Sequence, residues 1–410
     1  MRVLFATTVI PPSEASSGGD IVSLATVDAL RRFGCEVIVL GYLRPGQDAP
    51  TDPDTVVGGR RTIETSGSGA RAGVWMARSL ISRRPYTAEK FYGRAYAQCM
   101  RRLIKEKRID VVVVDHTQMT WLLDWLPSAV PVWLLMHNAE SELYAEGARF
   151  QQSRLGRALY RRESRNLRRL ETRAAARVEN IFVLSQTDAD VLRAAGAGTR
   201  ITVLPVMPEP GVQPRAASGE ASFDVALLAT WSWLPNIDAL RWFLKEIHPH
   251  LPRGISVHVA GAGAEHVLGG VPGITYRGFV SDVAGFLSGA KVVAVPTRYG
   301  SGVETKMLAA IATGRPIVAT PAATRGLGPL PSFVAIADDV PLFARLLAER
   351  VAAAEEPDWT SAALSWSRAR REIFLSTIRD ALQSGNAAMA APRRERTFLP
   401  PDLARGRVSI

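Results

Sequence analysis

The chain has 410 residues, of which 47% are hydrophobic and 22% charged, and it carries a formal net charge of +11. This length suits two to three domains of about 150 residues, and the composition excludes disorder over most of the chain. No apolar run reaches the ~18 residues of a membrane span, no signal peptide is recognised, and the two cysteines cannot form a disulfide scaffold or a four-ligand zinc site, so we expect a cytoplasmic protein.

The first 40 residues are predicted to form a βαβ unit. Residues 1–10 are largely apolar on both faces, which is typical of a buried parallel strand. A loop with the paired glycines Gly18 and Gly19 leads into a helix that starts near Ile21, and a strand follows over 36–40. A strand, a glycine loop, a helix and a second strand in this order indicate a parallel sheet.

The alternation of strands and helices continues to residue 204. Further strands are predicted at 111–114, 132–136, 180–184 and 201–204. Arg-rich helices are predicted between them, at about 73–107 and 150–177. Residues 205–222 contain four prolines and two glycines and are predicted to be a linker.

The same alternation restarts after the linker. Strands are predicted at 225–229, 256–260, 274–276, 291–295 and 316–320, and helices at about 236–249, 282–288 and 303–313. The pattern favours an α/β fold with two doubly wound parallel-sheet domains that face a cleft. We place their boundaries at 1–206 and 207–360, followed by a helix over 361–385 that could pack back on the first domain and a disordered tail over 386–410.

Two segments hold the positive charge. Residues 60–108 contain 13 Lys and Arg against 3 Asp and Glu, and residues 149–177 contain 10 Arg against 2 Glu. The excess in these two segments is larger than the net charge, so the rest of the chain is acidic overall. One explanation is a surface that faces membrane phosphates, nucleic acid or a phosphorylated substrate; solvated helix faces without a partner are the other.

Two candidate sites in the first half follow predicted strands, where ligands bind in doubly wound domains. Gly18 and Gly19 precede a helix N-terminus and could approach an anion, although a plain surface turn explains them too. His137 directly follows an apolar strand and could hydrogen-bond a substrate hydroxyl or phosphate. The alternative is that its neighbours only cap the next helix. Asp115 and His116 occupy the same kind of position one strand earlier.

The most informative segment runs from Pro296 to Thr320. A buried strand ends there, and a glycine-bearing loop leads to a predicted helix N-terminus near Val303, with Lys306 in the first turn. Backbone donors, a helix dipole and a cation at one point are suited to a diphosphate, whereas an ordinary loop with a solvated lysine is the alternative. The segment lacks the Gly-Lys-Ser/Thr ending of a P-loop, which disfavours ATP hydrolysis.

The segment from Pro296 to Thr320 resembles the donor-binding stretch of the retaining glycosyltransferases of family 4, which have the two-domain GT-B fold. Segments that match in order before it begin at Thr230, Val259 and Tyr276. In the first half, the segments that resemble bacterial polysaccharide and lipopolysaccharide members begin at Arg84, Asp115, His137 and Leu184. The resemblance covers about residues 1–385. It implies transfer of a sugar from a nucleotide-sugar donor to a glycan or lipid-linked acceptor, with retention, in cell-surface polysaccharide or glycoconjugate synthesis.

The resemblance also implies roles for individual residues. His137 would contact the transferred sugar as the candidate catalytic residue. The residues implied at the donor diphosphate are Gly18, Gly19, Gly302, Val303 and Lys306, and those implied at the base and ribose are Gly261, Phe279, Val280 and Glu304. Fixed amides and a lysine would stabilise the charge of the departing nucleoside diphosphate, so neither a metal nor another cofactor is expected.

The sequence departs from the family pattern at several positions. The two glutamates that the family commonly has in the donor-binding stretch correspond to Ser301 and Ala309, and Trp231 and Trp233 lie where an Arg/Lys pair is usual. The loss of the second glutamate weakens the expectation of ribose recognition. A catalytically silent sugar-nucleotide-binding subunit that regulates or scaffolds a partner is therefore an alternative. A sugar-nucleotide epimerase or phosphorylase of similar fold is another, but no cleft acid or base and no cofactor lysine is identified for it.

The resemblance suggests a function for the two basic segments, residues 60–108 and 149–177. Both lie in the domain that holds the acceptor in this fold, and Arg78, Arg83 and Arg84 accompany apolar residues between 75 and 81. Such a face could bind an anionic membrane that carries a lipid-linked acceptor, which would make the protein peripheral on the inner face of the plasma membrane. Core packing of the apolar residues is the alternative. No nucleic-acid-reading motif accompanies the charge, so nucleic acid is not expected as a partner.

Overall fold

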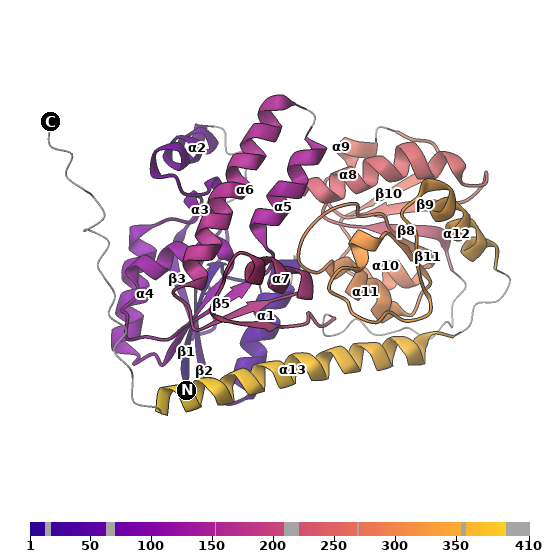
Figure 1. Ribbon diagram of the computed structural model, residues 1–410. Helices are drawn as coiled ribbons and strands as arrows, with labels where there is room; N and C mark the ends of the chain where they lie inside the picture. Colours follow the sequence, from indigo (N-terminus) through magenta and orange to yellow (C-terminus); the bar gives the residue numbers. More distant parts are fainter. Residues whose placement is uncertain are drawn as a thin grey trace.

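The computed structural model describes residues 1–12, 18–62, 70–151, 153–208, 221–268, 270–353 and 358–390. These residues form two parallel β-sheets, each flanked by helices, which stand side by side (Figure 1). The expected α/β fold with two doubly wound parallel-sheet domains is confirmed.

The first sheet has seven parallel strands in the order β3-β2-β1-β4-β5-β6-β7. They are β1 (Arg2–Val9), β2 (Glu36–Leu43), β3 (Thr55–Arg60), β4 (Val111–Asp115), β5 (Val132–Met136), β6 (Asn180–Val183) and β7 (Arg200–Val203). All residues of β4 and β5 are buried, as central parallel strands require. The strand order reverses between β1 and β4, and at such a point the carboxyl ends of the strands leave a crevice for a ligand.

Seven α-helices surround this sheet within the described residues. They are α1 (Gly18–Arg32), α2 (Ala70–Ser82), α3 (Tyr86–Glu89), α4 (Arg94–Glu106), α5 (Glu140–Gly147), α6 (Arg154–Ala175) and α7 (Gln186–Ala194). Two 3₁₀ segments accompany them, η1 (Thr117–Trp125) and η2 (Ala148–Phe150).

The single helix expected over 73–107 is wrong, because the chain forms α2, α3 and α4 there. Arg83 has a φ of 58°, and Pro85 lacks the N–H that a continuous helix would need. Gly93 is extended before α4, with a φ of −157°. The helical periodicity of the sequence is therefore interrupted twice by backbone conformation.

The second sheet has six parallel strands in the order β10-β9-β8-β11-β12-β13. They are β8 (Phe223–Leu228), β9 (Val257–Ala260), β10 (Ile274–Gly278), β11 (Ala290–Val295), β12 (Ile317–Ala319) and β13 (Val334–Ile336). Its strand order reverses between β8 and β11, so the second sheet also has a crevice at its carboxyl edge.

The helical segments of the second half are α8 (Leu234–Trp242), η3 (Phe243–Ile247), η4 (His248–His250), α9 (Glu265–Leu268), α10 (Val283–Ser288), α11 (Thr305–Thr313), η5 (Pro321–Thr324), α12 (Val340–Ala352) and α13 (Thr360–Ala390). The helix expected to start near Val303 begins two residues later, at Thr305. The helix expected over 361–385 extends to Ala390, so residues 386–390 are helical rather than part of a tail. The rest of the expected tail, 391–410, lies outside the described residues.

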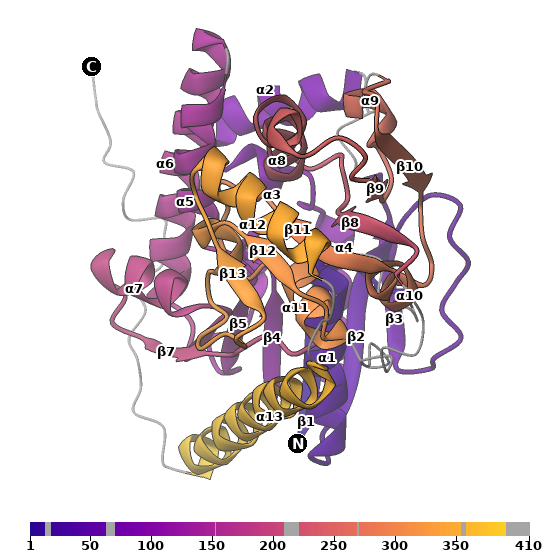
Figure 2. The same cartoon turned by 90° about the vertical axis from the view of Figure 1, so that its right-hand side faces the viewer.

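Helix α13 runs along both domains (Figures 1 and 2). It contacts α11 in the second domain and α1 in the first. Arg370, which is buried in α13, donates hydrogen bonds to the carbonyl oxygens of Val206 and Leu327 at 2.7 Å each. A continuous buried apolar cluster includes Phe5 of β1, Ile311 of α11 and Phe374 of α13. The two sheets are therefore joined by shared packing.

Within the described residues, no helix combines the length and the hydrophobicity needed to cross a membrane.

Candidate functional site

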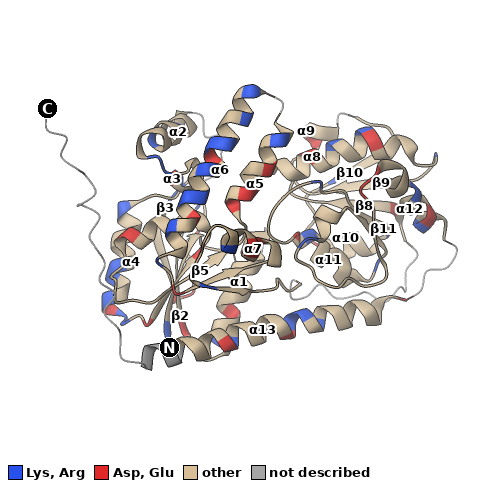
Figure 3. Ribbon diagram, viewed as in Figure 1, with Lys and Arg blue, Asp and Glu red and all other residues tan. Residues whose placement is uncertain are grey.

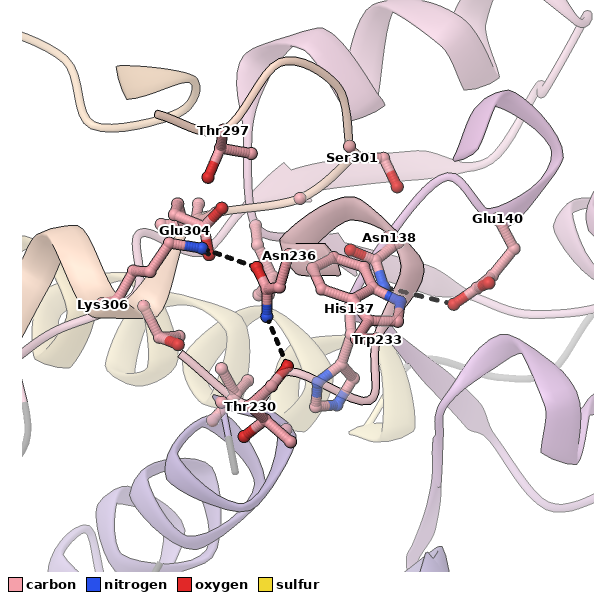
Figure 4. A pocket seen from close by; sticks show the side chains of 18 of the residues that line it. His137, Asn138, Glu140, Thr230, Trp233, Asn236, Thr297, Ser301, Glu304 and Lys306 are labelled. Atoms are coloured by element: carbon pink, nitrogen blue, oxygen red, sulfur yellow. Dashed lines mark hydrogen bonds and ion pairs between the residues drawn. The ribbon is translucent and has the colours of Figure 1, made fainter. Parts of the chain in front are cut away.

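A cavity of about 510 Å³, which we call the cleft pocket, lies where the carboxyl ends of the two sheets meet. Its lining includes residues that directly follow strands of both sheets, such as His137 after β5 and Ala229 after β8. Figure 4 shows side chains from both domains pointing into this space. The cleft pocket therefore has one wall from each domain.

The second-domain wall consists mainly of the loop from Gly300 to Glu304 and the start of α11. Gly302 has a φ of 72°, and a Cβ added to it would lie 2.4 Å from the backbone oxygen of His137. Only glycine allows this loop to approach the first domain so closely. The expected diphosphate residues Gly302, Val303 and Lys306 all line the pocket.

Lys306 lies in the first turn of α11, and its side chain is only 12% exposed. Its Nζ lies 2.9 Å from Oε1 of Glu304 and donates a hydrogen bond of 2.8 Å to Oδ1 of Asn236 (Figure 4). Asn236 is fixed in turn, because its Nδ2 donates to the carbonyl oxygen of Thr230 at 2.9 Å. A held cation at a helix N-terminus provides a binding site for anionic oxygens.

Two hydroxyl groups of this wall are buried without a hydrogen-bond partner, Oγ1 of Thr297 and Oγ of Ser301. Both residues line the cleft pocket. An unpaired buried hydroxyl is costly, so a ligand that bonds to them is stabilised. Ser301 occupies the position of the first family glutamate and reaches the pocket, whereas Ala309, at the position of the second, packs against the apolar cluster and is not part of the lining.

The first-domain wall is organised around Asp115, a fully buried carboxylate at the end of β4. Its Oδ1 lies 2.7 Å from Nε2 of His137, and its Oδ2 accepts hydrogen bonds of 2.7 Å from Thr7 and Ser23. The ring of His116 stacks on that of His137, with 3.7 Å between the centroids. Sequence analysis thus identified the three residues separately, and the structure brings them together.

Burial and neighbouring groups together set the charges of this wall. Burial raises the pKa of Asp115, but His116, His137 and the hydrogen bonds from His137 and Thr7 outweigh that effect, so the pKa lies well below its ordinary value. Burial, together with His137, lowers the pKa of His116 to about 4. At neutral pH Asp115 is therefore ionised and His116 neutral. An ionised Asp115 accepts from Nε2 of His137, which leaves the other ring nitrogen, Nδ1, for a ligand.

Asp115, His116 and His137 are also the group that could hold a metal within the described residues, since one ligand atom from each lies within 4.8 Å of the others. The two imidazole rings are stacked, with an angle of 14° between their planes. Donors from Thr7 and Ser23 already occupy Oδ2 of the carboxylate. The arrangement is that of a hydrogen-bonded network that positions His137.

The paired glycines also reach the cleft pocket. Gly18 and Gly19 begin α1 and line the cavity, and a Cβ on Gly18 would lie 2.6 Å from Oγ1 of Thr305. The alternative explanation of His137 as part of a capping sequence is not supported, since no side-chain hydrogen bond caps α5. Ser141 instead donates to Glu171.

The residues expected at the base and ribose separate into two groups. Glu304 lines the pocket, where it is paired with Lys306. Gly261, Phe279 and Val280 are not part of the lining, and Phe279 is 76% exposed beyond the edge strand β10. Their assignment to the nucleotide base therefore stays a prediction without a pocket contact.

Arg78, Arg83 and Arg84 lie on and after α2, away from the cleft pocket. Arg78 and Arg83 are exposed. Arg84 is engaged within the protein, because its guanidinium lies 3.6 Å from Glu89 and 4.2 Å above the ring centroid of Tyr92.

Sequence reasoning missed several pocket residues, among them Asn236, Thr297 and Arg325. Asn236 lies 70 positions from Lys306 and carries no local signal for their contact. Trp231 and Trp233, which lie where the family usually has an Arg/Lys pair, occupy different environments. Trp233 lines the pocket, whereas Trp231 is buried and donates to the carbonyl oxygen of Ala260 at 2.8 Å.

Two family models match this chain. A model described as glycosyl transferase 4-like domain matches residues 17–207, and a model described as glycosyl transferases group 1 matches residues 224–346. The two matches correspond to the two sheets. No curated protein matches the sequence.

Solved structures share the fold at low sequence identity. Sucrose-phosphate synthase from Thermosynechococcus elongatus is 13% identical with a TM-score of 0.68, over 96% of this chain and 100% of that one. The UDP-forming α,α-trehalose-phosphate synthase from Burkholderia xenovorans, in complex with glucose-6-phosphate, is 14% identical with a TM-score of 0.61, over 94% and 99%. The lipopolysaccharide outer core galactosyltransferase WaaB is 10% identical with a TM-score of 0.56, over 94% and 99%.

Proposed function

This chain is a glycosyltransferase of group 1 with the two-domain GT-B fold, and we propose that it transfers a sugar from a nucleotide-sugar donor to a glycan or lipid-linked acceptor with retention of configuration. The proposed setting is the synthesis of cell-surface polysaccharides or glycoconjugates. The proposal rests most on one observation: Lys306 and the glycine loop of one domain face His137 of the other across a single pocket.

The second-domain wall is assigned to the donor diphosphate. During transfer, the bond between the anomeric carbon and the diphosphate oxygen breaks, and negative charge grows on the leaving group. Backbone amides of Gly302 and Val303, the N-terminus of α11 and Lys306 stabilise that charge without having to reorganise. Lys306 forms an ion pair with Glu304, so donor binding would replace one anionic partner by another.

The first-domain wall is assigned to the transferred sugar and the acceptor. The acceptor oxygen forms the new bond to the anomeric carbon, and its proton leaves with the nucleoside diphosphate. His137, oriented by Asp115, offers a ring nitrogen for a sugar hydroxyl. This scheme requires no metal, because the amides and the lysine carry the charge stabilisation.

Thermal-shift measurements with UDP, GDP, ADP, TDP and CMP, with and without magnesium, test the donor assignment. A nucleotide that binds only the folded protein raises the melting temperature by mass action. We expect one clear hit. Lys306→Ala should abolish its shift, whereas Lys245→Ala, which removes an exposed lysine of the same domain, should leave it unchanged.

A shift that survives in Lys306→Ala would contradict the diphosphate assignment. No shift with any nucleotide would contradict the transferase proposal as a whole. The absence of both family glutamates, at Ser301 and Ala309, would then favour a catalytically silent subunit that regulates or scaffolds a partner and has also lost nucleotide binding.

We also propose that the first domain binds an anionic membrane surface through α2 and the basic helix α6. Arginine residues recur along α6 (Figure 3). On α2, Leu80 is 57% and Ile81 86% exposed, beside the exposed Arg78. An apolar tip flanked by arginines is suited to the interface of an anionic bilayer.

Flotation with vesicles of phosphatidylcholine and phosphatidylglycerol tests this association. The double variant Arg78→Ser and Arg83→Ser should lose most binding at low salt, since each basic residue near the surface contributes about 1 kcal/mol. The matched control is Arg101→Ser with Arg102→Ser, two exposed arginines of α4. Equal binding by both double variants would refute an interface at α2.

A further inference from the structure

A second cavity, of about 490 Å³, lies beside the cleft pocket. We call it the apolar pocket. The two cavities share Trp233, whose side chain is 39% exposed and lines both. The apolar pocket therefore adjoins the space assigned to the reacting sugar, and Trp233 lies at their common boundary.

The walls of the apolar pocket come from both domains and are largely apolar or aromatic. Its apolar and aromatic lining consists of Met76, Tyr86, Leu143, Tyr144, Leu159, Tyr160, Trp233, Leu234, Pro235 and Tyr299. The first six belong to α2, α3, α5 and α6, and the other four to the second domain. A concave site with such walls favours an apolar ligand.

The charged residues of this lining are already engaged within the protein. Glu163 accepts hydrogen bonds from the backbone N–H groups of Tyr86 and Thr87, at 2.9 Å each. Arg162 donates to the backbone oxygen and the hydroxyl of Ser79. The ammonium group of Lys90 lies 5.0 Å from the ring centroid of Tyr86. These groups support the walls, and the apolar side chains remain to contact a ligand.

Large hydrophobic side chains are exposed on the segments that contribute to the apolar pocket. Eleven large hydrophobic side chains are exposed among the described residues, and seven of them lie on α2, α6 or the start of α8: Val74, Leu80, Ile81, Leu155, Leu159, Trp233 and Leu234. These segments lie along one edge of the molecule in both views (Figures 1 and 2). Exposed apolar patches of this kind mark interaction sites.

Positive charge lies on the same helices as these exposed hydrophobic side chains. Arg157, Arg161 and Arg165 are exposed on α6, and Arg78 and Arg83 are exposed on and after α2. A ligand that suits these helices has an apolar chain for the pocket and an anionic group for the arginines that α2 and α6 carry. A purely polar glycan satisfies neither requirement.

We infer that the apolar pocket binds the acyl or isoprenoid chain of a lipid-linked acceptor next to its head group. The head group then extends past Trp233, so that the acceptor hydroxyl enters the cleft pocket. This inference rests on the proposed transferase function and narrows its acceptor to lipids. Helix α2 carries both the exposed apolar tip assigned to the membrane and Met76 of the apolar pocket, so a lipid chain could pass from the bilayer to the pocket along one helix.

Calorimetric titration with alkyl β-glucosides below their critical micelle concentrations tests the pocket without a donor. We expect no heat with methyl β-glucoside, measurable binding with the hexyl compound and roughly tenfold tighter binding with the octyl compound, because each buried methylene adds a favourable increment. Binding of an apolar chain should also give a negative heat-capacity change.

A matched pair of variants on α6 locates the binding. Leu159 lines the pocket and is 38% exposed, whereas Leu155, one turn earlier, is 70% exposed and is not part of the lining. Leu159→Glu should abolish binding of octyl β-glucoside, and Leu155→Glu should keep it within about twofold. Both side chains are exposed, so neither substitution buries a charge, and unchanged melting temperatures verify the fold.

Three outcomes overturn the inference. These are affinity that is independent of chain length, equal binding by Leu159→Glu and the unsubstituted protein, and tighter binding of 2-naphthyl than of octyl β-glucoside, which would indicate a planar aromatic acceptor instead. Failure here is distinguishable from failure of the proposed function, because nucleotide thermal shifts report on the cleft pocket alone.

Discussion

The two walls of the cleft pocket are assigned to different ligand groups, the diphosphate and the sugar, and they present different chemical groups. The second-domain wall offers backbone amides, the hydroxyls of Thr297 and Ser301, and one lysine. The first-domain wall presents the imidazoles of His116 and His137, and the buried carboxylate of Asp115 contacts His137 from behind the wall. A diphosphate always carries negative charge, so fixed donors suffice for it. A sugar hydroxyl both donates and accepts hydrogen bonds. Its wall therefore needs groups whose donor and acceptor atoms are fixed by their surroundings, as an imidazole held by a carboxylate is.

This difference predicts that the walls can be separated by experiment. Substitutions in the second domain should change nucleotide binding, as for Lys306 above. Substitutions in the first domain should change turnover and leave nucleotide binding nearly intact.

His137→Ala should lower kcat about 10²- to 10³-fold, the usual cost of removing one polar group that contacts the reacting centre. The dissociation constant of the nucleoside diphosphate should change less than threefold, because His137 lies on the opposite wall from Lys306. Release of nucleoside diphosphate from the donor measures kcat, and titration calorimetry measures binding. A variant that loses nucleotide binding along with turnover would show that the two walls do not act separately.

The sequence was sufficient for the central parts of both sheets. Strands β4 and β5 were recognised because each is an uninterrupted apolar run in the sequence, apart from Asp115 at the end of β4. The edge strands β3 and β13 were missed, since both are mostly half-buried and lack such an apolar run, and β13 has only 3 residues. Helix α12 was missed as well.

The site was predictable where one strand end or one helix start carries the chemistry. His137 and Lys306 have this property, and both line the cleft pocket. The hydrogen bond from Lys306 to Asn236 and the stacking of His116 on His137 depend on contacts between distant segments. The apolar pocket was not foreseen for the same reason, because α2, α6 and α8 are far apart in the chain.

Asp115→Asn tests whether the buried carboxylate positions His137. We expect kcat to fall about 10- to 100-fold, since an amide can present its NH₂ group to Nε2 and turn the ring or change its tautomer. The free energy of unfolding should fall by about 1–3 kcal/mol, because Thr7 and Ser23 also lose an anionic acceptor. Urea denaturation measures the stability and donor turnover measures kcat.

The pH dependence of Asp115→Asn supplies the control for a positioning role. If Asp115 acts through His137, the pH profile of kcat should shift in Asp115→Asn as well as fall in amplitude. A uniform loss at every pH that parallels the loss of folded protein would indicate a structural role alone.

The smallest expected effect concerns Glu171, which lies beneath the first-domain wall. It is 3% exposed and accepts hydrogen bonds from the backbone N–H and the hydroxyl of Ser141, at 3.1 and 2.6 Å. Burial raises the pKa of Glu171 from 4.5 to about 7, despite the opposing effect of the bonds from Ser141. The folded protein therefore binds a proton between about pH 4.5 and 7 that the unfolded chain has released.

Because the folded state binds more protons in this window, the free energy of unfolding must decrease as the pH rises from about 4.5 to 7 and level off above 7, and the decrease between pH 6 and 8 is about 1 kcal/mol. Glu171→Gln removes this titration and should flatten the stability curve between these pH values while retaining the contact with Ser141. Hydrogen exchange of peptides from α5 and α6 at pH 6 and pH 8 measures the effect within the first domain. An unchanged slope in Glu171→Gln would assign the pH sensitivity of this wall to other groups, such as Glu140, whose pKa burial also raises.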